Sequence, residues 1–283
     1  MKKIILFLLI SFMFIPIVRA AELETRAKSA ILIDQNTGTI LYKKNENERL
    51  PMASMTKIMS LVLIMEQIYN KTISYDDVVE ISQDASSMGG SQIFLQAGDK
   101  YKVKELLKSV AMASANDAVV ALAEKTYGSK EQFIEAMNKK TKELGLKNTN
   151  FVNVHGLDDE NHYSCPYDMA MIASELLKHE SILKYSSIYE EYLKKNDGSS
   201  VWMVNTNKLI KYYKGLDGLK TGYTKLAGYN LTATAKRNDM RLISVVMGEE
   251  TSEARSKDTI ELLDYGFNNY KLKTIYDKNT FLG

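Results

Sequence analysis

Two residues near the N-terminus have the types and spacing of an activated serine. Ser54 and Lys57 form an S-x-x-K motif at the start of an apolar stretch, residues 53–69. On a helix the i, i+3 spacing places both side chains on one face. Apolar residues cover nearly every face of this stretch, which predicts a helix buried at the centre of the protein. Burial and a helix N-terminus both disfavour an ammonium ion, so Lys57 is predicted to act as a base near neutral pH.

The S-x-x-K spacing alone is a weak signal, because Ser181 and Lys184 repeat it in a polar segment. We interpret that second copy as accidental. The first copy therefore needs support from other motifs in the sequence.

Two further motifs provide that support. One is Ser114-Ala115-Asn116, the only S-x-N in the chain, and the other is Lys220-Thr221-Gly222, the only K-[ST]-G. Each has an ordinary structural interpretation, the first as a helix cap and the second as a turn into a strand. A glycine at 222 would also let a substrate backbone approach a strand edge. In the order S-x-x-K, S-x-N, K-T-G the three motifs together are a strong signal for one catalytic site.

Other catalytic signatures are missing from the sequence. It contains no H-E-x-x-H, C-x-x-C, P-loop, G-x-G-x-x-G or G-x-S-x-G motif. The three histidines, His155, His162 and His179, lack metal-site spacing, so neither a metal nor a cofactor is expected. Cys165 with His162 is a conceivable nucleophile pair, but a lone cysteine before a helix is more often a small buried residue.

The periodicity of the chain predicts an α+β fold. Two hairpins lie near opposite ends of the chain, and helices fill the middle. The simplest packing is one antiparallel sheet, built from both ends, with the helical block against it. The expected strands are 29–34, 39–43, 229–236 and 241–248; the expected helices are 53–69, 103–112, 117–127, 129–144, 168–177 and 252–265.

The composition is that of a globular protein stabilised by a packed core. The chain has 283 residues, of which 45% are hydrophobic and 25% charged, as in ordinary globular proteins. A formal charge of +2 leaves no large basic surface for nucleic acid. The single cysteine cannot form an internal disulfide, so stability must come from a packed core.

The first 20 residues are typical of a secretory signal peptide. A positive start is followed by an apolar run and then by Val18-Arg19-Ala20, which predicts cleavage after Ala20. An uncleaved anchor is the alternative, but the run of about 15 residues is shorter than the ~20 that a spanning helix needs. Cleavage would leave a net charge of about −1 on an exported protein. No linker divides the rest, so we expect one catalytic domain, 21–270, and a short tail, 271–283.

On these motifs the sequence resembles the low-molecular-mass penicillin-binding proteins that are D-alanyl-D-alanine carboxypeptidases (peptidase family S11), most of all the Gram-positive, sporulation-associated branch. The resemblance runs from about residue 23 to 270. Beyond the three motifs it includes Pro51-Met52-Ala53, Gly89-Gly90-Ser91, Gly98-Asp99, His155-Gly156-Leu157-Asp158, His162-Tyr163-Ser164, Tyr167-Asp168-Met169-Ala170 and Gly215-Leu216-Asp217-Gly218-Leu219.

The resemblance implies a fold and a catalytic cycle. The fold is that of serine β-lactamases and DD-peptidases, a five-stranded antiparallel sheet flanked by helices. Ser54 would attack the penultimate D-alanine carbonyl of a peptidoglycan stem pentapeptide, and Lys57 would take its proton. Water would then hydrolyse the acyl-enzyme. β-Lactams would acylate the same serine.

The resemblance also assigns the remaining site residues. Ser114 would relay a proton to the departing D-alanine, and Asn116 would hold the substrate amide. Lys220, Thr221 and Gly222 would bind the end of the substrate, with Lys220 and Thr221 on its carboxylate. The backbone N–H groups of Ser54 and Tyr223 would form the oxyanion hole.

Two departures from the family pattern limit what can be transferred. Family members usually continue into a β-rich second domain and a membrane-binding helix, whereas this chain ends at Gly283, so membrane contact is left open. Cys165 occupies a position where a threonine or another small residue is expected. We interpret it as a packing substitution.

Two alternative functions are weighed against the peptidase. A class A β-lactamase shares the fold and all three motifs, but it needs an E-x-x-L-N loop, which this sequence lacks. A catalytically silent wall-binding protein of the same fold would be expected to lose Ser54 or Lys57, and both are present.

Overall fold

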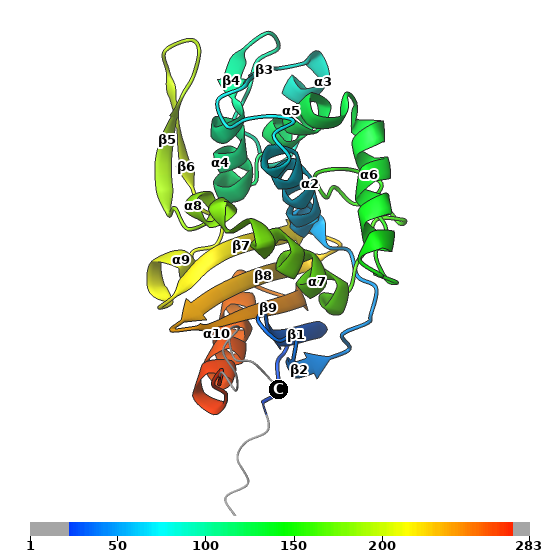
Figure 1. Ribbon diagram of the computed structural model, residues 1–283, viewed down its shortest axis with the longest axis vertical. Helices are drawn as coiled ribbons and strands as arrows, with labels where there is room; N and C mark the ends of the chain where they lie inside the picture. The colour runs from blue at the N-terminus through cyan, green and yellow to red at the C-terminus, as the bar shows by residue number, and fades with distance from the viewer. Residues whose placement is uncertain (1–22, 274–283) are drawn as a thin grey trace, which may run out of the picture.

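A five-stranded antiparallel sheet organises the protein in the computed structural model, which describes residues 23–273. The strand order is β2-β1-β9-β8-β7 (Figure 1), so strands from both ends of the chain lie side by side as predicted. β1 pairs with β9 in register from Ser29 opposite Met247 to Asp34 opposite Leu242. The strands are β1 (Ser29–Asp34), β2 (Ile40–Lys44), β7 (Leu216–Thr224), β8 (Gly228–Arg237) and β9 (Met240–Glu249).

Helices cover both faces of this sheet (Figure 1). One core lies between the sheet and the helical block, and a second lies between the sheet and α10. The helical block contains α2 (Lys57–Tyr69), α3 (Gln83–Ser86), α4 (Val103–Ala113), α5 (Asn116–Tyr127), α6 (Lys130–Glu143), α7 (Pro166–Leu176), η2 (Leu177–Ile182) and α8 (Leu183–Ser186). The remaining helices are η1 (Ala53–Thr56), α9 (Leu209–Tyr212) and α10 (Ser252–Asn269).

Helix α2 lies at the centre, as its apolar pattern predicts. Every residue from Lys57 to Met65 is buried, and α5, α6 and α7 pack around it. Its predicted first turn is different in the structure, because residues 53–56 form the separate 3₁₀ turn η1. Ala53 begins this turn with φ +48°, which is incompatible with a continuous right-handed helix. Ser54 therefore lies on a tight turn that precedes the helix.

Several predicted helix ends are confirmed by their caps. The Ser129 hydroxyl accepts a hydrogen bond from Gln132 N at the start of α6, and Gly145 follows that helix with φ +69°. Thr251 caps α10 in the same way, through a bond from Ala254 N. These local signals depend only on neighbouring residues, which is why sequence reasoning finds them.

Five strands were not predicted. Where a turn followed by the K-T-G motif was expected, the structure has strand β7. It completes the sheet by pairing along its length with β8. The other four form two small two-stranded sheets outside the main sheet, β3 (Val78–Glu80) with β4 (Lys100–Lys102), and β5 (Glu190–Lys194) with β6 (Ser200–Val204). Charged residues and short length hide the period-2 pattern in these segments.

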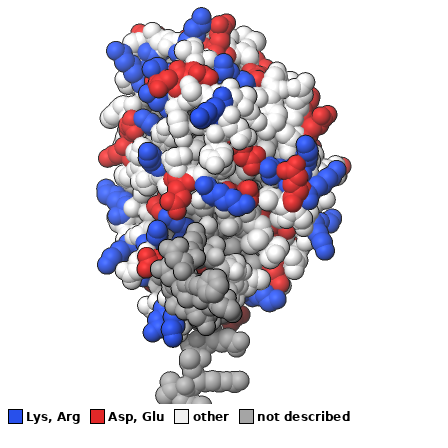
Figure 2. Space-filling view, viewed as in Figure 1, with Lys and Arg blue, Asp and Glu red and all other residues white. Residues whose placement is uncertain are grey.

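The predicted signal peptide, residues 1–20, lies outside the described residues, and so does most of the predicted tail. Within residues 23–273, no helix is both long enough and apolar enough to cross a membrane. On the face shown in Figure 2, acidic and basic side chains are interspersed, in keeping with the small net charge.

Candidate active site

Ser54 and Lys57 lie within hydrogen-bond distance of each other at the junction of η1 and α2. The Lys57 Nζ is 2.9 Å from the Ser54 Oγ and donates to the His155 carbonyl at 2.6 Å. The lysine side chain has no exposed surface. If the amine is neutral, donation to His155 leaves its lone pair available for the Ser54 proton.

The environment of Lys57 favours that neutral amine. Burial is the largest cause of a pKa well below the usual value of a lysine, and the positive charge of Lys220 lowers the pKa further. The carboxylate of Asp117 acts in the opposite direction and raises it. Since Lys220 belongs to the K-T-G strand and Asp117 follows the S-x-N motif, all three motif segments approach one another around Lys57.

Ser114 ends helix α4 in a left-handed conformation, with φ 63°. Its hydroxyl is buried, and among the described residues it has no hydrogen-bond partner. A left-handed residue other than glycine or asparagine is uncommon and often marks a functional turn. The free hydroxyl is therefore available to a bound molecule.

Asn116 begins helix α5 and is fixed by two hydrogen bonds. Its Nδ2 donates to the Gly89 carbonyl at 2.7 Å, and its backbone N–H donates to the Ser91 carbonyl at 2.7 Å. A Cβ at Gly90 would lie 2.8 Å from the same Nδ2, so only glycine permits this approach. The buried Oδ1 of Asn116 has no partner within residues 23–273, and it can accept a substrate N–H.

Lys220 is a buried lysine on strand β7. Its side chain is 1% exposed, and its Nζ donates to the Thr221 carbonyl at 3.0 Å. No described carboxylate lies within ion-pair distance of it. Burial, followed by the charge of Arg255, lowers the pKa of Lys220 to about 7. A carboxylate arriving from outside would supply the missing counter-ion.

Thr221 and Gly222 connect β7 to the rest of the site. The Thr221 hydroxyl donates to Thr206 Oγ1 at 2.7 Å, and Thr206 N donates to the Met112 carbonyl near the end of α4. A Cβ at Gly222 would lie 2.6 Å from the Met52 carbonyl. The glycine therefore lets β7 pack against the turn that carries Ser54.

Tyr223, the next residue on β7, is 54% exposed. Its ring stacks on Tyr229 of β8 with centroids 4.2 Å apart. Its backbone lies next to Gly222, at the point where β7 meets η1.

The structure adds two charged residues that sequence reasoning missed. Asp117 is buried and accepts hydrogen bonds from Ile93 N and Leu95 N, which holds that loop beside α5. Arg255 lies in the first turn of α10, is 8% exposed, and has no partner for its Nε among the described residues. A basic residue at a helix N-terminus is electrostatically unfavourable, and that signal could have identified it.

Other candidates from the sequence do not form sites. Lys184 is exposed, and the Ser181 hydroxyl is 3.0 Å from the Tyr75 hydroxyl. The Cys165 Sγ accepts a bond from Asp168 N as the cap of α7, and burial raises the pKa of this thiol to about 12. His162 instead contacts Thr56, with 2.7 Å between Nε2 and Oγ1. No group of three or more metal-ligating side chains occurs within residues 23–273.

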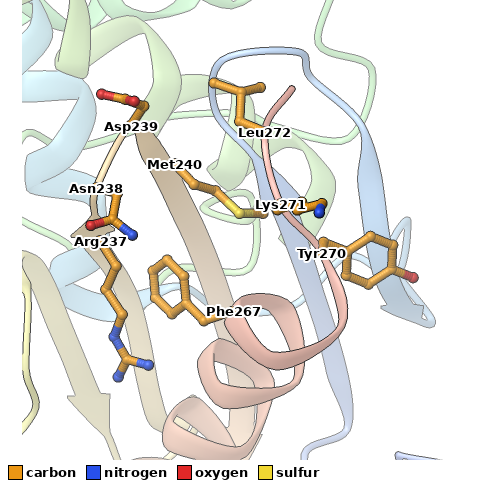
Figure 3. A pocket seen from close by; sticks show the side chains of 8 residues that line it. All are labelled: Arg237, Asn238, Asp239, Met240, Phe267, Tyr270, Lys271 and Leu272. Atoms are coloured by element: carbon orange, nitrogen blue, oxygen red, sulfur yellow. The ribbon is translucent and has the colours of Figure 1, made fainter. Parts of the chain in front are cut away.

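A pocket between the β8–β9 turn and the C-terminal end of α10 lies away from these residues (Figure 3). It begins at Arg237, whereas Gly222 pairs with Asn230 at the other end of β8. The Arg237 guanidinium stacks on Tyr213 and Phe267, with distances of 4.8 and 4.4 Å to the ring centroids. None of the residues that the three sequence motifs contribute lines this pocket.

Comparisons with known proteins agree with this geometry. The family model described as D-alanyl-D-alanine carboxypeptidase (Peptidase_S11) matches residues 17–251. The D-alanyl-D-alanine carboxypeptidase DacF of Bacillus subtilis is 54% identical over 261 residues, which cover 92% of this chain and 67% of that protein.

Two solved structures have the same fold. The carboxypeptidase DacD of Francisella tularensis superposes with a TM-score of 0.88 at 29% identity, covering 93% of this chain and 76% of that one. The ampicillin-bound penicillin-binding protein D2 of Listeria monocytogenes superposes with a TM-score of 0.77 at 30% identity, covering 87% and 99%. The expected five-stranded DD-peptidase fold is therefore confirmed.

Proposed function

Since the chain belongs to the D-alanyl-D-alanine carboxypeptidase family of serine peptidases, we propose that it removes the C-terminal D-alanine from peptidoglycan stem pentapeptides through an acyl-enzyme on Ser54. The geometry around Ser54 and Lys57 is the observation that carries this proposal. A buried amine with a lowered pKa lies 2.9 Å from the hydroxyl that it must deprotonate.

Acylation then follows from the position of each group. The Ser54 Oγ bonds to the carbonyl carbon of the penultimate D-alanine while its proton moves to Lys57. The carbonyl oxygen becomes an oxyanion, for which we propose the N–H groups of Ser54 and Tyr223 as donors. When the peptide bond breaks, the proton on Lys57 passes through the unpartnered Ser114 hydroxyl to the departing nitrogen, and free D-alanine leaves.

Recognition of a free C-terminus fits the positive charge around Lys220. Lys220 is a buried cation without an anionic partner among the described residues, and Arg255 adds a second positive charge near it. A terminal carboxylate would pair with Lys220 and hydrogen-bond to Thr221. Asn116, whose Oδ1 is unpartnered, would accept a bond from the peptide N–H of the substrate.

Deacylation returns the enzyme to its starting state. Water attacks the ester carbonyl of the acyl-enzyme, and Lys57, neutral again after acylation, takes one proton from it. The carbonyl–Oγ bond breaks, and this proton passes from Lys57 to the Ser54 oxygen. The shortened peptide leaves as a carboxylate and releases the second proton of the water to solvent. β-Lactams would acylate Ser54 by the same route, since their ring amide replaces the D-Ala–D-Ala peptide bond. The ampicillin-bound relative from Listeria supports this expectation.

We also propose that the protein acts outside the cytoplasm. The signal-like residues 1–20 and the peptidoglycan substrate proposed here support export. The sporulation-type branch that the sequence resembles stays part of this proposal, alongside the 54% identity to DacF of Bacillus subtilis.

The decisive experiment compares two peptides. We expect diacetyl-Lys-D-Ala-D-Ala to release D-alanine, and its C-terminally amidated form to react at least tenfold more slowly. Equal cleavage of both would refute the carboxylate role of Lys220 and Thr221. Nitrocefin provides the second arm: a stoichiometric burst followed by a stall fits the peptidase, whereas sustained rapid turnover would mean a β-lactamase.

A further inference from the structure

The residue before the nucleophile has an unusual backbone conformation. Ala53 has φ +48°, in the left-handed region that a residue with a Cβ rarely occupies. Its carbonyl accepts a hydrogen bond of 2.7 Å from the Thr56 hydroxyl. A bond from threonine to the carbonyl three residues back is common in a helical turn and by itself indicates no function. The partner of Thr56 is what distinguishes this one.

That partner is His162, and the direction of the hydrogen bonds is fixed. The Val152 N–H donates to His162 Nδ1 at 3.1 Å, so Nδ1 carries no proton. The ring proton therefore lies on Nε2 and is donated to Thr56 Oγ1 at 2.7 Å, which leaves the threonine proton for the Ala53 carbonyl. The imidazole is 2% exposed, and burial lowers the pKa of His162 to about 4, so the ring is neutral at pH 7.

These hydrogen bonds form a relay from His162 through Thr56 to the Ala53 carbonyl oxygen. This oxygen belongs to the peptide that joins Ala53 to Ser54. That peptide is planar and trans, so its N–H points opposite to its C=O. A hydrogen bond that fixes the Ala53 oxygen therefore also fixes the direction of the Ser54 N–H. This N–H is one of the two proposed oxyanion donors.

We propose that His162, acting through Thr56, is a positioning residue that aims the Ser54 N–H at the developing oxyanion. The inference rests on the proposed function, in which Ser54 is the nucleophile. Aiming one donor affects the transition state more than the bound substrate, so the acylation rate should change while non-covalent binding does not.

A purely structural role for His162 is the competing explanation. Its ring packs against Phe151 with centroids 5.8 Å apart, so removing it also leaves a hole in the core. Two variants separate the roles, because each keeps one half of the relay. His162→Asn keeps an acceptor near the Nδ1 position and loses the donor to Thr56. His162→Gln keeps a donor near the Nε2 position and loses the acceptor for Val152.

The test measures the rate of acylation by a fluorescent penicillin, with unfolding midpoints for every variant. We expect acylation about 10- to 100-fold slower in His162→Asn and at least tenfold faster in His162→Gln than in His162→Asn. KM for the peptide substrate should stay within threefold of wild type. Equal rates in the two variants, or rates that follow their stabilities, would overturn the proposal.

A second pair keeps the proposal testable if His162→Asn does not fold. Thr56→Val removes the relay at similar volume, and Thr56→Ser restores the hydroxyl. We expect Thr56→Val to be slow and Thr56→Ser to recover most of the rate; equal rates would again overturn the inference. Labelling of Ser54→Ala distinguishes the two failures, because a labelled Ser54→Ala would refute the proposed function itself.

Discussion

Gly156 packs directly against the carbonyl of Ala53. A Cβ at position 156 would lie 2.0 Å from the Ala53 oxygen and 2.8 Å from the Ser54 nitrogen. Gly156 also has φ +97°, which side chains rarely adopt. The neighbouring His155 carbonyl accepts the hydrogen bond from Lys57. One backbone segment therefore shapes the turn of the nucleophile and holds its base.

Gly156→Ala should displace the Ala53–Ser54 peptide and inactivate the enzyme. We expect a loss of at least 100-fold in acylation and a fall of more than about 3 kcal/mol in the free energy of unfolding. Gly145→Ala is the matched control, because Gly145 has φ +69° but nothing within 4 Å of its Cβ position. It should cost only about 1 kcal/mol and leave acylation unchanged. Equal effects at both positions would mean that contact with Ala53 is unimportant.

Lys57→Ala should abolish acylation and leave the fold intact. Removing a general base slows the reaction by about 10²- to 10⁴-fold, and the lost side chain was a buried cation rather than an apolar anchor. Stopped-flow labelling with a fluorescent penicillin measures the rate, and circular dichroism checks the fold. Lys184→Ala, in the second S-x-x-K, provides the control and should label normally. A wild-type rate in Lys57→Ala would remove Lys57 from the mechanism.

Peptide recognition should weaken as pH rises through the pKa of Lys220. In the free enzyme this pKa is lowered to about 7, mainly by burial, so the side chain is a cation below pH 7 and neutral above it. Because the carboxylate needs the cation, kcat/KM should fall on the basic side with a midpoint near 7. Lys220→Arg keeps its charge at high pH, so the fall of kcat/KM on the basic side (the basic limb) should move to higher pH in this variant, whatever its absolute rate. An unmoved limb would contradict the assignment.

The free energy of unfolding should fall in mild acid. Burial lowers the pKa of both His155 and His162 to about 4, against 6.5 for a free histidine. The charge of Lys57 lowers both further, whereas Asp159 raises that of His162. Between pH 6.5 and 4 the unfolded chain binds more protons, so each histidine removes up to about 3 kcal/mol of stability as pH falls through this window.

Urea unfolding at pH 7.5 and 4.5 measures this loss. His162→Gln replaces a titrating side chain with one that does not titrate, so its pH dependence should be smaller by about 2 to 3 kcal/mol. An unchanged difference between the two pH values would show that His162 does not titrate in this range.

Cys165 should be unreactive in the folded protein. Its Sγ caps α7, and burial raises the pKa of the thiol to about 12, so almost no thiolate is present at neutral pH. We expect alkylation by iodoacetamide only after unfolding, and full activity in Cys165→Ser, because serine is a strong N-cap. Inactivation by alkylation of the folded enzyme would restore Cys165 as a nucleophile candidate.

The prediction of the fold succeeded where short-range signals are strong. The hairpin strands β8 and β9 and the helices α6 and α10 depend on neighbours in sequence, and their predicted bounds lie within four residues of the observed ones. β7 was missed as a strand, because two glycines interrupt its pattern and pairing with β8 stabilises it from outside. The 3₁₀ turn η1 was missed for a similar reason, since contacts with Gly156 and Gly222 enforce it.

The prediction of the site rested on side-chain types and could not include backbone partners. The motifs identified Ser54, Lys57 and Lys220, and the structure brings their segments together; the chemical roles assigned to them stay predictions. The His155 carbonyl was missed because any residue can supply a carbonyl. Asp117 was missed because its partners are the backbone N–H groups of a distant loop.

The sheet order sets when the enzyme can first become active during its own synthesis. The ribosome makes β1 and the turn of Ser54 early, but β1 can pair only with β2, and not with the rest of the sheet, until β9 exists. Lys220 and the strand that carries it come about 166 residues after Ser54. A nascent chain that stops short of β9 therefore holds Ser54 and Lys57 beside an incomplete sheet. We conclude that the hydrolase stays inert until the ribosome has made β9.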